Sequence, residues 1–594
     1  MNRMTRAMGM ATIGLVLLAV GCPPQPRPQP SRIAWPKAPD TAAPYKLTAD
    51  FDQHVKMRDG VDLLADVYRP DATGLFPVIL MRSPYNKGQM SKFWSDQVKY
   101  YVRHGYVVVS QDVRGRGESD GRFTPFQQEG PDGYDSVEWC ASQPWSSGKV
   151  GMLGASYDAY AAWLAAAQQP PHLAGMVVAA SPSDPFVENP TGLPQPMYIS
   201  WYHYVAGRTL QDADILDWAE LFKHQPMYTL DEAARRPNPN WKALIDHPRL
   251  DDWWEPSRYQ NKFERISVPV LHVSGWYDDE LIGTPLNYIG MTTRAPAEVR
   301  EAQRLLIGPW PHQFNRETKI GDVEFGPTAV IDFCAYAVHW FDRWLKGIDN
   351  GVTGEPPVRI FVMGGGGWRD EHEWPLARTQ FTEYYLHSRG RANSADGDGG
   401  LSTSAPGDES ADMYIADPAN PVPLITDPSF IQIGGPDDYR PVEAREDVLV
   451  YSTPSLQTDV EVCGPVRITL FAASTAPDTD FVARLIDVRP DGFAQRLCDG
   501  LVRARFRGGH EKEALIEPGR VYEYQIDCWN TCHVLKKGHR IRIEITSSAF
   551  PAHDVNPNTG GSLGKTVGGV RATQRILHDS QHPSRVVLPV VPRS

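Results

Sequence analysis

The stretch that most constrains this chain of 594 residues is 150–160, with the sequence VGMLGASYDAY. Its apolar start is typical of the end of a buried strand, and the Ala-rich run that continues to Ala167 is typical of a helix. Ser156 stands in the turn between them. Such a turn strains the backbone, exposes the serine hydroxyl and points the helix N-terminus at a developing oxyanion. Asp158 replaces the last glycine of the usual G-x-S-x-G pattern, so an ordinary glycine-rich strand–helix loop is the alternative.

Two later strand ends favour the catalytic interpretation. Residues 270–280 form a hydrophobic strand that ends in Asp278, Asp279 and Glu280, and residues 304–312 form another that ends in His312. A serine, an acid and a histidine in this order, each directly after a strand, follow the chain order of an α/β-hydrolase triad. In open α/β sheets, active sites collect at the carboxyl ends of the strands. The sequence therefore predicts a serine hydrolase that uses Ser156, Asp278 and His312.

The pattern along the chain predicts an α/β sheet interrupted by one insertion. We expect a hairpin over 51–68 that turns at Asp59 and Gly60, then the elements 76–85, 106–110, 130–143 and 174–181 as strand, strand, helix and strand. This alternation indicates a mostly parallel sheet. From 186 to 264 it stops, and tryptophans and tyrosines gather between prolines. We interpret this segment as a helical cap that supplies an apolar pocket wall, although most of its aromatic residues are expected only to pack the cap onto the body.

The predicted fold is thus α/β: an α/β-hydrolase domain over 43–185 and 265–350, with the helical cap inserted at 186–264. Beyond 355, short alternating strands recur between turns as far as the C-terminus at 594. This spacing predicts an all-β domain of the jelly-roll type. The loop 111–121 is rich in glycine and charge but precedes no helix, so we expect an arginine–acid network there rather than a phosphate-binding loop.

The N-terminal sequence is typical of an export signal. Arg3 and Arg6 precede an apolar run over 8–21, which is too short to span a bilayer and fits a signal peptide. Small residues lead into Cys22 as in a bacterial lipoprotein box, so residues 1–22 are predicted to be a lipoprotein signal peptide, with Cys22 lipidated. The alternative is an ordinary secretory signal cut nearby. The Pro-rich linker at 23–42 then places an exported enzyme on the periplasmic or cell-surface side of a membrane.

Charge and cysteine content narrow the partners. The net charge of −13 and the pI of about 5.7 argue against nucleic acid. Export makes disulfides feasible, but the sequence does not assign pairs among Cys140, Cys334, Cys463, Cys498, Cys528 and Cys532. Cys528 and Cys532 are accompanied only by His533, so no metal and no cofactor is expected.

The chain resembles the cocaine esterase/X-Pro dipeptidyl-peptidase family of α/β-hydrolases, which also includes α-amino-acid ester hydrolases and cephalosporin acylases. The resemblance rests on the motifs GASY at 154–157, GWYD at 275–278 and IGPWPH at 307–312, and on 464–466, 476–481, 487–492, 538–542 and 547–560 in the C-terminal part. It implies a hydrolase domain, a helical cap and a jelly roll.

The resemblance also implies roles for single residues. Ser156 would be the nucleophile, His312 the general base and acid, and Asp278 the residue that orients it. The oxyanion would be held by the backbone N–H of Tyr157 and the hydroxyl of Tyr85. Ala159 stands where the family usually has the glycine of G-x-S-Y-x-G.

The resemblance implies a small-molecule ester, an amide or a short peptide as substrate. Family members that recognise a free α-amine use acidic residues near the catalytic aspartate, which makes Asp279 and Glu280 candidate substrate-binding residues. Leu281, however, stands where α-amino-acid ester hydrolases have a second acid. Simple esterase or acylase, X-Pro dipeptidyl-peptidase and α-amino-acid ester hydrolase remain alternatives. An inactive surface protein that binds glycan or peptide is the alternative from another class.

Overall fold

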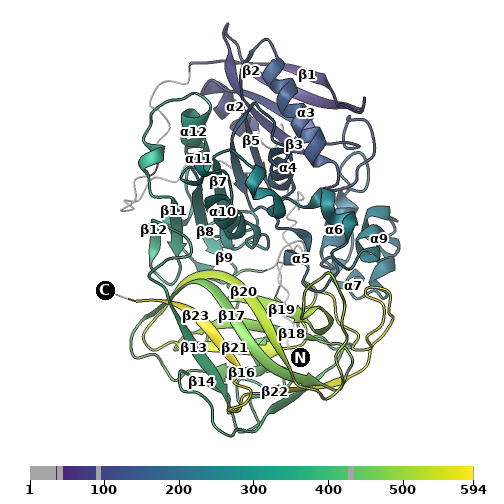
Figure 1. Cartoon of the computed structure of the whole chain (residues 1–594), viewed down its shortest axis with the longest axis vertical. Helices are drawn as coiled ribbons and strands as arrows, with labels where there is room; N and C mark the ends of the chain where they lie inside the picture. The colour runs from purple at the N-terminus through teal and green to yellow at the C-terminus, as the bar shows by residue number, and fades with distance from the viewer. Residues whose placement is uncertain (1–34, 36–43, 89–94, 426–433, 593–594) are drawn as a thin grey trace, which may run out of the picture.

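The computed structural model describes residues 35, 44–88, 95–425 and 434–592. The predicted signal peptide, Cys22 and almost all of the Pro-rich linker lie outside these residues. Figure 1 shows a hydrolase sheet with its helices at one end of the molecule and a large β domain at the other. No helix in the described part combines the length and apolar character that crossing a membrane requires.

The hydrolase sheet has ten strands in the order β1-β2-β4-β3-β5-β6-β7-β8-β11-β12. All pairs from β4 to β11 are parallel, whereas β1, β2 and β12 are antiparallel to their neighbours. The bounds are β1 (Leu47–Lys56), β2 (Asp62–Pro70), β3 (Phe76–Ser83), β4 (Val107–Asp112), β5 (Ser146–Ala155), β6 (Leu173–Ala179), β7 (Val270–Tyr277), β8 (Arg304–Pro311), β11 (Val358–Val362) and β12 (Gly367–Glu371). The mostly parallel α/β sheet is the predicted one.

Helices bury both faces of this sheet, as a parallel sheet requires. In β3, Ile79 and Met81 belong to one buried cluster, whereas Val78 and Leu80 belong to another. The first cluster contains residues of α2 (Ser95–Arg103) and α12 (Phe333–Trp344), and the second contains residues of α3 (Glu129–Ser142), α4 (Tyr157–Ala166), α10 (Gly283–Thr293) and α11 (Ala297–Arg300). The alternation of buried residues along β3 therefore fixes one helix layer on each side.

The segment after β6 forms short helices, as the loss of strand–helix alternation predicts. They are α5 (Pro185–Glu188), α6 (Tyr198–Tyr204), α7 (Trp218–Leu221), α8 (Leu230–Ala233) and α9 (Pro239–Asp246), with the 3-10 turns η1 (Met227–Thr229), η2 (Asp252–Ser257) and η3 (Gln260–Arg265). Figure 1 shows α5, α6, α7 and α9 where the hydrolase sheet meets the β domain. Trp218 and Trp241 pack in one buried cluster with Ile486 and Phe506 of the β domain. The cap is thus packed against both domains.

The C-terminal domain is an 11-stranded sheet in the order β15-β22-β17-β23-β13-β14-β16-β21-β18-β19, with β20 paired to β17. Its pairs are antiparallel except β14–β16. The bounds are β13 (Gln380–His387), β14 (Gly400–Ser402), β15 (Asp412–Ala416), β16 (Leu449–Ser452), β17 (Val460–Ser474), β18 (Asp480–Val488), β19 (Ala494–Arg503), β20 (Tyr522–Leu535), β21 (Arg540–Thr546), β22 (Ala572–Leu577) and β23 (Arg585–Val591). Backbone bonds between Met363, just after β11, and β20 connect the two domains.

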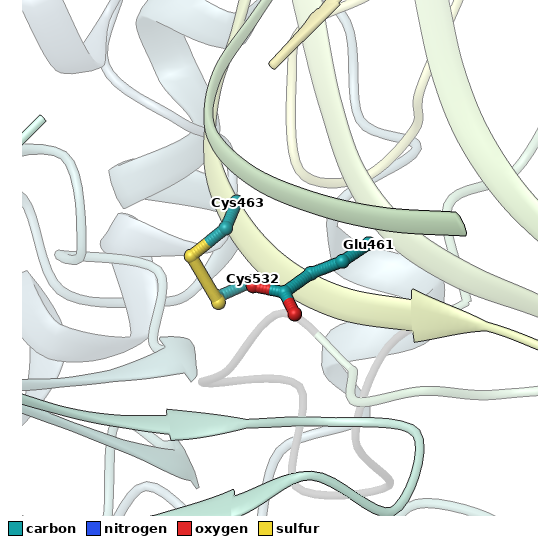
Figure 2. A group of neighbouring side chains, drawn as sticks. All are labelled: Glu461, Cys463 and Cys532. Carbon is teal, nitrogen blue, oxygen red and sulfur yellow. A yellow bond between two sulfur atoms is a disulfide. The ribbon is translucent and has the colours of Figure 1, made fainter. Parts of the chain in front are cut away.

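One disulfide links the two long central strands of this domain. Cys463 of β17 and Cys532 of β20 stand directly opposite each other and are bonded, with 4.0 Å between their Cα atoms. Figure 2 shows the Glu461 carboxylate beside this disulfide. Both sulfur atoms are shared in the S–S bond, so neither is a thiolate ligand for a metal. Cys140, Cys498 and Cys528 are buried free thiols.

Candidate active site

Ser156 occupies a strained turn between β5 and α4. Its φ of 54° and ψ of −124° lie in a region that L-residues rarely adopt. Its N–H donates to the carbonyls of Ala179 and Ala180, at 3.0 Å each, where the neighbouring strand β6 ends. A Cβ on Gly154 would lie 2.4 Å from the carbonyl carbon of Asp158, so only glycine lets the helix approach the strand this closely. The turn therefore has the geometry of a nucleophile elbow.

Asp278 and His312 follow the adjacent parallel strands β7 and β8, so they lie at the same sheet edge as Ser156. The Nδ1–H of His312 donates to Oδ1 of Asp278 at 2.7 Å. Asp278 is held in turn by the hydroxyl of Ser274, at 2.7 Å from Oδ2, and by the N–H of Glu280, at 3.0 Å from Oδ1. Ser156 and His312 line one cavity of about 170 Å³. The structure thus brings the three sequence-predicted residues together.

Asp279 lies beside the histidine rather than only at the substrate rim. Its Oδ1 is 3.2 Å from Nδ1 of His312. Burial raises the pKa of the Asp279 carboxyl. Burial by itself would lower the pKa of His312, but the Asp279 and Asp278 carboxylates outweigh it and raise that pKa above its usual value. Two carboxylates therefore act on one imidazole.

Tyr85 and Tyr157 are the two predicted oxyanion donors. Both line the cavity with Ser156. Tyr157 is the first residue of α4, so its backbone N–H has no acceptor within the helix. The Nε1–H of Trp201, in the cap, donates to the Tyr85 hydroxyl oxygen at 3.0 Å. Burial and Asp158 raise the pKa of Tyr85, while hydrogen bonds from Trp201 and Ser156 act in the opposite direction. The phenol is therefore a protonated donor at neutral pH.

Two buried arginines come from the charged loop 111–121. Arg116 donates to the carbonyls of Pro84, at 2.8 Å, and of Val205, at 2.7 Å, and so ties the Tyr85 loop to the cap. Arg114 forms ion pairs with Asp132 and Asp59 at 2.6 and 2.8 Å. The arginine–acid network predicted for 111–121 therefore includes Arg114, whereas Arg116 binds carbonyl groups instead.

Glu280 and Glu188 form a buried carboxylate pair in the cavity wall. Glu188, on α5, was not among the sequence-predicted residues, because only the folding of the cap brings it to the strand ends. Burial raises the pKa of both carboxyl groups. The neighbouring Glu188 carboxylate raises the pKa of Glu280 further. The hydroxyl of Tyr198 donates to Oε1 of Glu280 at 3.2 Å, and the Glu280 and Glu188 carboxyl groups interact with each other. None of the described residues that line the cavity is Lys or Arg.

The rest of the cavity wall is largely apolar and aromatic. It includes Phe126, Phe186, Leu193, Met197, Trp201 and Trp254. The cap aromatics thus divide into two groups, because Trp201 and Trp254 line the cavity whereas Trp218 and Trp241 pack inside the cap. The positioning role of Trp201 toward Tyr85 had no signal in the sequence beyond its place in the aromatic segment.

Comparison with known proteins gives consistent matches along the chain. Residues 59–313 match the model of X-Pro dipeptidyl-peptidase (S15 family), and residues 350–587 match that of the X-Pro dipeptidyl-peptidase C-terminal non-catalytic domain. Cocaine esterase from Rhodococcus sp. is 37% identical over 570 residues, which cover 91% of this chain and 98% of that protein.

Two solved structures are similar over nearly the whole length. An aminopeptidase from a marine sediment archaeon, Thaumarchaeota archaeon, has a TM-score of 0.81 at 23% identity, and an α-amino acid ester hydrolase has a TM-score of 0.80 at 24% identity. Each match covers 95% of this chain and 99% of the other. The chain belongs to the cocaine esterase/X-Pro dipeptidyl-peptidase family of serine hydrolases.

Proposed function

We propose that this hydrolase cleaves small acyl esters or amides through an acyl-enzyme on Ser156, with His312 as general base and Asp278 as the residue that orients it. The observation that carries the proposal is the strained elbow at Ser156, which faces the same cavity as an imidazole held by a buried aspartate. A serine hydroxyl is a weak nucleophile at neutral pH and needs an adjacent base. Asp278 binds Nδ1–H, so Nε2 is the nitrogen left to accept the proton.

The proposed reaction has two balanced steps. Ser156 Oγ attacks the acyl carbon as its proton passes to His312. The tetrahedral intermediate then collapses, and the departing alcohol or amine takes that proton. Water, deprotonated by the same imidazole, next attacks the acyl-enzyme, and Ser156 recovers a proton as the acid leaves. In both steps the N–H of Tyr157 and the hydroxyl of Tyr85 would stabilise the negative oxygen.

The cavity favours a substrate with an apolar acyl group. Its apolar walls support an esterase activity like that named for the 37% identical cocaine esterase. Buried Glu280 and Glu188, in a cavity whose described lining contains no Lys or Arg, support a second candidate, hydrolysis of α-amino-acid esters, since a substrate ammonium would pair with them. X-Pro dipeptide release remains an alternative that rests on the family match.

We also propose, from the sequence alone, that the enzyme is exported and anchored to a membrane through lipidated Cys22. The apolar run before this cysteine and the prolines after it support the proposal. The mass of the mature N-terminal peptide would show the modification, and an unmodified Cys22 would contradict it.

Ser156→Ala removes the nucleophile and should lower kcat by a factor on the order of 10⁴ to 10⁶, because the remaining groups still bind substrate but no acyl-enzyme forms. The measurement is steady-state hydrolysis of a nitrophenyl ester, with the melting temperature as a check on folding. Ser142→Ala, an exposed serine in α3, is the matched control. A Ser156→Ala enzyme with wild-type kcat would refute the assignment.

Tyr85→Phe removes one oxyanion donor and keeps the ring against the cap. A donor that acts mainly in the transition state should cost roughly 10²- to 10³-fold in kcat with little change in KM. Tyr204→Phe, whose ring packs 6.2 Å from that of Tyr85, is the control and should keep kcat near wild type. If both variants retain wild-type kcat, Tyr85 serves only packing.

Asp279→Asn should shift the acidic limb of the kcat/KM profile to lower pH. The neutral imidazole is the active form, and its fraction rises as pH increases through the pKa of His312. Asp279 raises that pKa, so removing its negative charge lowers the pKa and the pH at which activity appears. Glu298→Gln, an exposed acid on α11, is the control. An unchanged limb, or a shift to higher pH, would contradict the coupling.

Glu280→Gln tests the amine site. A charge-assisted bond between this carboxylate and a substrate ammonium contributes about 1.5–3 kcal/mol, or about a ten- to hundredfold preference for a phenylglycine ester over its N-acetyl form. The variant should lose that preference and hydrolyse the N-acetyl ester as wild type does. Equal kcat/KM for both esters in the wild-type enzyme would dispose of amine recognition and leave a general esterase.

A further inference from the structure

One wall of the active-site cavity is held by the C-terminal domain. The wall is the segment 186–194, from which Phe186, Glu188, Asn189, Gly192, Leu193 and Pro194 line the cavity. Two of its backbone carbonyls face the C-terminal domain. The carbonyl of Thr191 accepts from Nη1 of Arg503 at 3.1 Å, and the carbonyl of Pro190 lies 3.1 Å from Nε2 of His510. The wall therefore takes two hydrogen bonds from outside the hydrolase domain.

Arg503, the last residue of β19, is a rigid donor. Asp480 binds its Nε and Nη2, both at 2.8 Å, and Asp554 binds Nη2 at 3.0 Å. The side chain of Asn556 donates to Asp480 at 2.8 Å and holds that carboxylate in turn. The guanidinium is fully buried, and its planar fork is fixed by the bidentate pair. The remaining Nη1 is thus aimed at the carbonyl of Thr191.

His510 supports the wall with its ring as well as its nitrogen. The ring lies 5.1 Å from that of Phe186 and is stacked 4.9 Å from that of Phe506. Burial lowers the pKa of His510. The imidazole is therefore neutral at pH 7, and its Nε2–H is the hydrogen that the Pro190 carbonyl can accept. Phe186 packs in turn on Trp254 at 5.2 Å, and both rings line the cavity.

The wall and the C-terminal domain are in tight contact at Gly192. A Cβ on Gly192 would lie 2.5 Å from the ring of Phe506 and 2.6 Å from the carbonyl oxygen of Pro248. Only glycine therefore fits between the ring of Phe506 and the carbonyl of Pro248 at this position. Elsewhere a cavity of about 90 Å³ lies between Val187, Glu188 and Pro190 and the strand β19, so the bonds from Arg503 and His510, and not packing alone, hold the wall in place.

We propose that Arg503 and His510 are specificity-determining positioning residues, through which the C-terminal domain sets the width of the acyl cavity. Neither residue lines the cavity or touches the reacting groups, so they act through the backbone of 190–191 and the ring of Phe186. This proposal rests on the proposed function in one respect, namely that the cavity receives the acyl group. On this proposal the C-terminal domain, whose family model is described as non-catalytic, takes part in substrate selection.

The experiment compares two nitrophenyl esters, an acetate and a phenylacetate, in wild type, Arg503→Lys and His510→Ala. The single ammonium of lysine cannot form the two-pronged bond to the Asp480 carboxylate and also donate to the carbonyl of Thr191. If the wall is displaced, kcat/KM for the phenylacetate should fall roughly tenfold, mainly because KM rises. Lost contacts between an apolar pocket and an acyl group change kcat/KM by factors of this size. The acetate, which does not reach the wall, should change by less than about twofold.

Arg505→Lys is the matched control. Arg505 is also buried and is held by Asp478 and Glu513 at 2.8 Å each, but it donates to the carbonyl of Gly561 rather than to the wall. It should leave the ratio of the two esters unchanged. His510→Phe keeps an aromatic ring but loses the hydrogen-bond donor, so it separates the two contributions of His510. It should lower the ratio of kcat/KM for the phenylacetate to kcat/KM for the acetate by less than His510→Ala does.

Equal losses for both esters, no loss, or the same selective loss in Arg505→Lys would overturn the proposal, since each indicates general destabilisation or no coupling. His510 lies in a loop after β19, so His510→Ala keeps the test valid if Arg503→Lys fails to fold. Ser156→Ala is run with the same esters. Turnover by that variant would contradict the proposed function, whereas the ester ratio in the other variants tests the wall alone.

Discussion

The hydrogen bond between Asp278 and His312 is the interaction on which the rest of the site depends. It joins the ends of two neighbouring parallel strands, β7 and β8, so its 2.7 Å length requires the correct register of the sheet. The elbow at Ser156 ends β5, and the N–H of Ser156 is held by carbonyls at the end of β6. Four adjacent strands therefore place the nucleophile, its backbone support, the acid and the base along one edge.

A cluster of acidic side chains also lies at this edge of the sheet. Asp278, Asp279 and Glu280 act on one imidazole, Glu188 lies beside Glu280, and the described lining of the cavity contains no Lys or Arg. Burial of so many acids in one place is unfavourable unless some are protonated or a cation approaches. His312 becomes such a cation when it takes a proton in the proposed reaction, and a substrate ammonium would be another. The same acids thus connect the protonation of the base with the choice of substrate.

How much of this could be predicted depends on the range of the signals. Ser156, Asp278 and His312 were identifiable because each stands at the end of an apolar strand, which is a local pattern. Asp279 was expected at the substrate rim, since adjacency in sequence does not say that its carboxylate turns to the imidazole. Glu188 and Trp201 come from the cap, whose fold has no periodic signal. Their roles follow only from tertiary packing.

The C-terminal domain shows the same limit. Its strands were predictable from their alternation, but not the fact that β19 contacts the site on two sides. Gln495, near its start, donates to the hydroxyl of Tyr277 at 3.1 Å, directly before Asp278, and Arg503 at its end holds the cavity wall. These contacts join residues more than 200 positions apart. No pattern within a single element could have indicated them.

The central claim is that Ser156 is the nucleophile activated by His312, and covalent labelling tests it most directly. A fluorophosphonate probe reacts only with an activated serine, and its site can be located by peptide mass spectrometry. Wild-type protein should carry one label, on the peptide that contains Ser156, and the His312→Ala protein should label far more slowly. Label on another serine, or undiminished labelling of Ser156→Ala, would contradict the account.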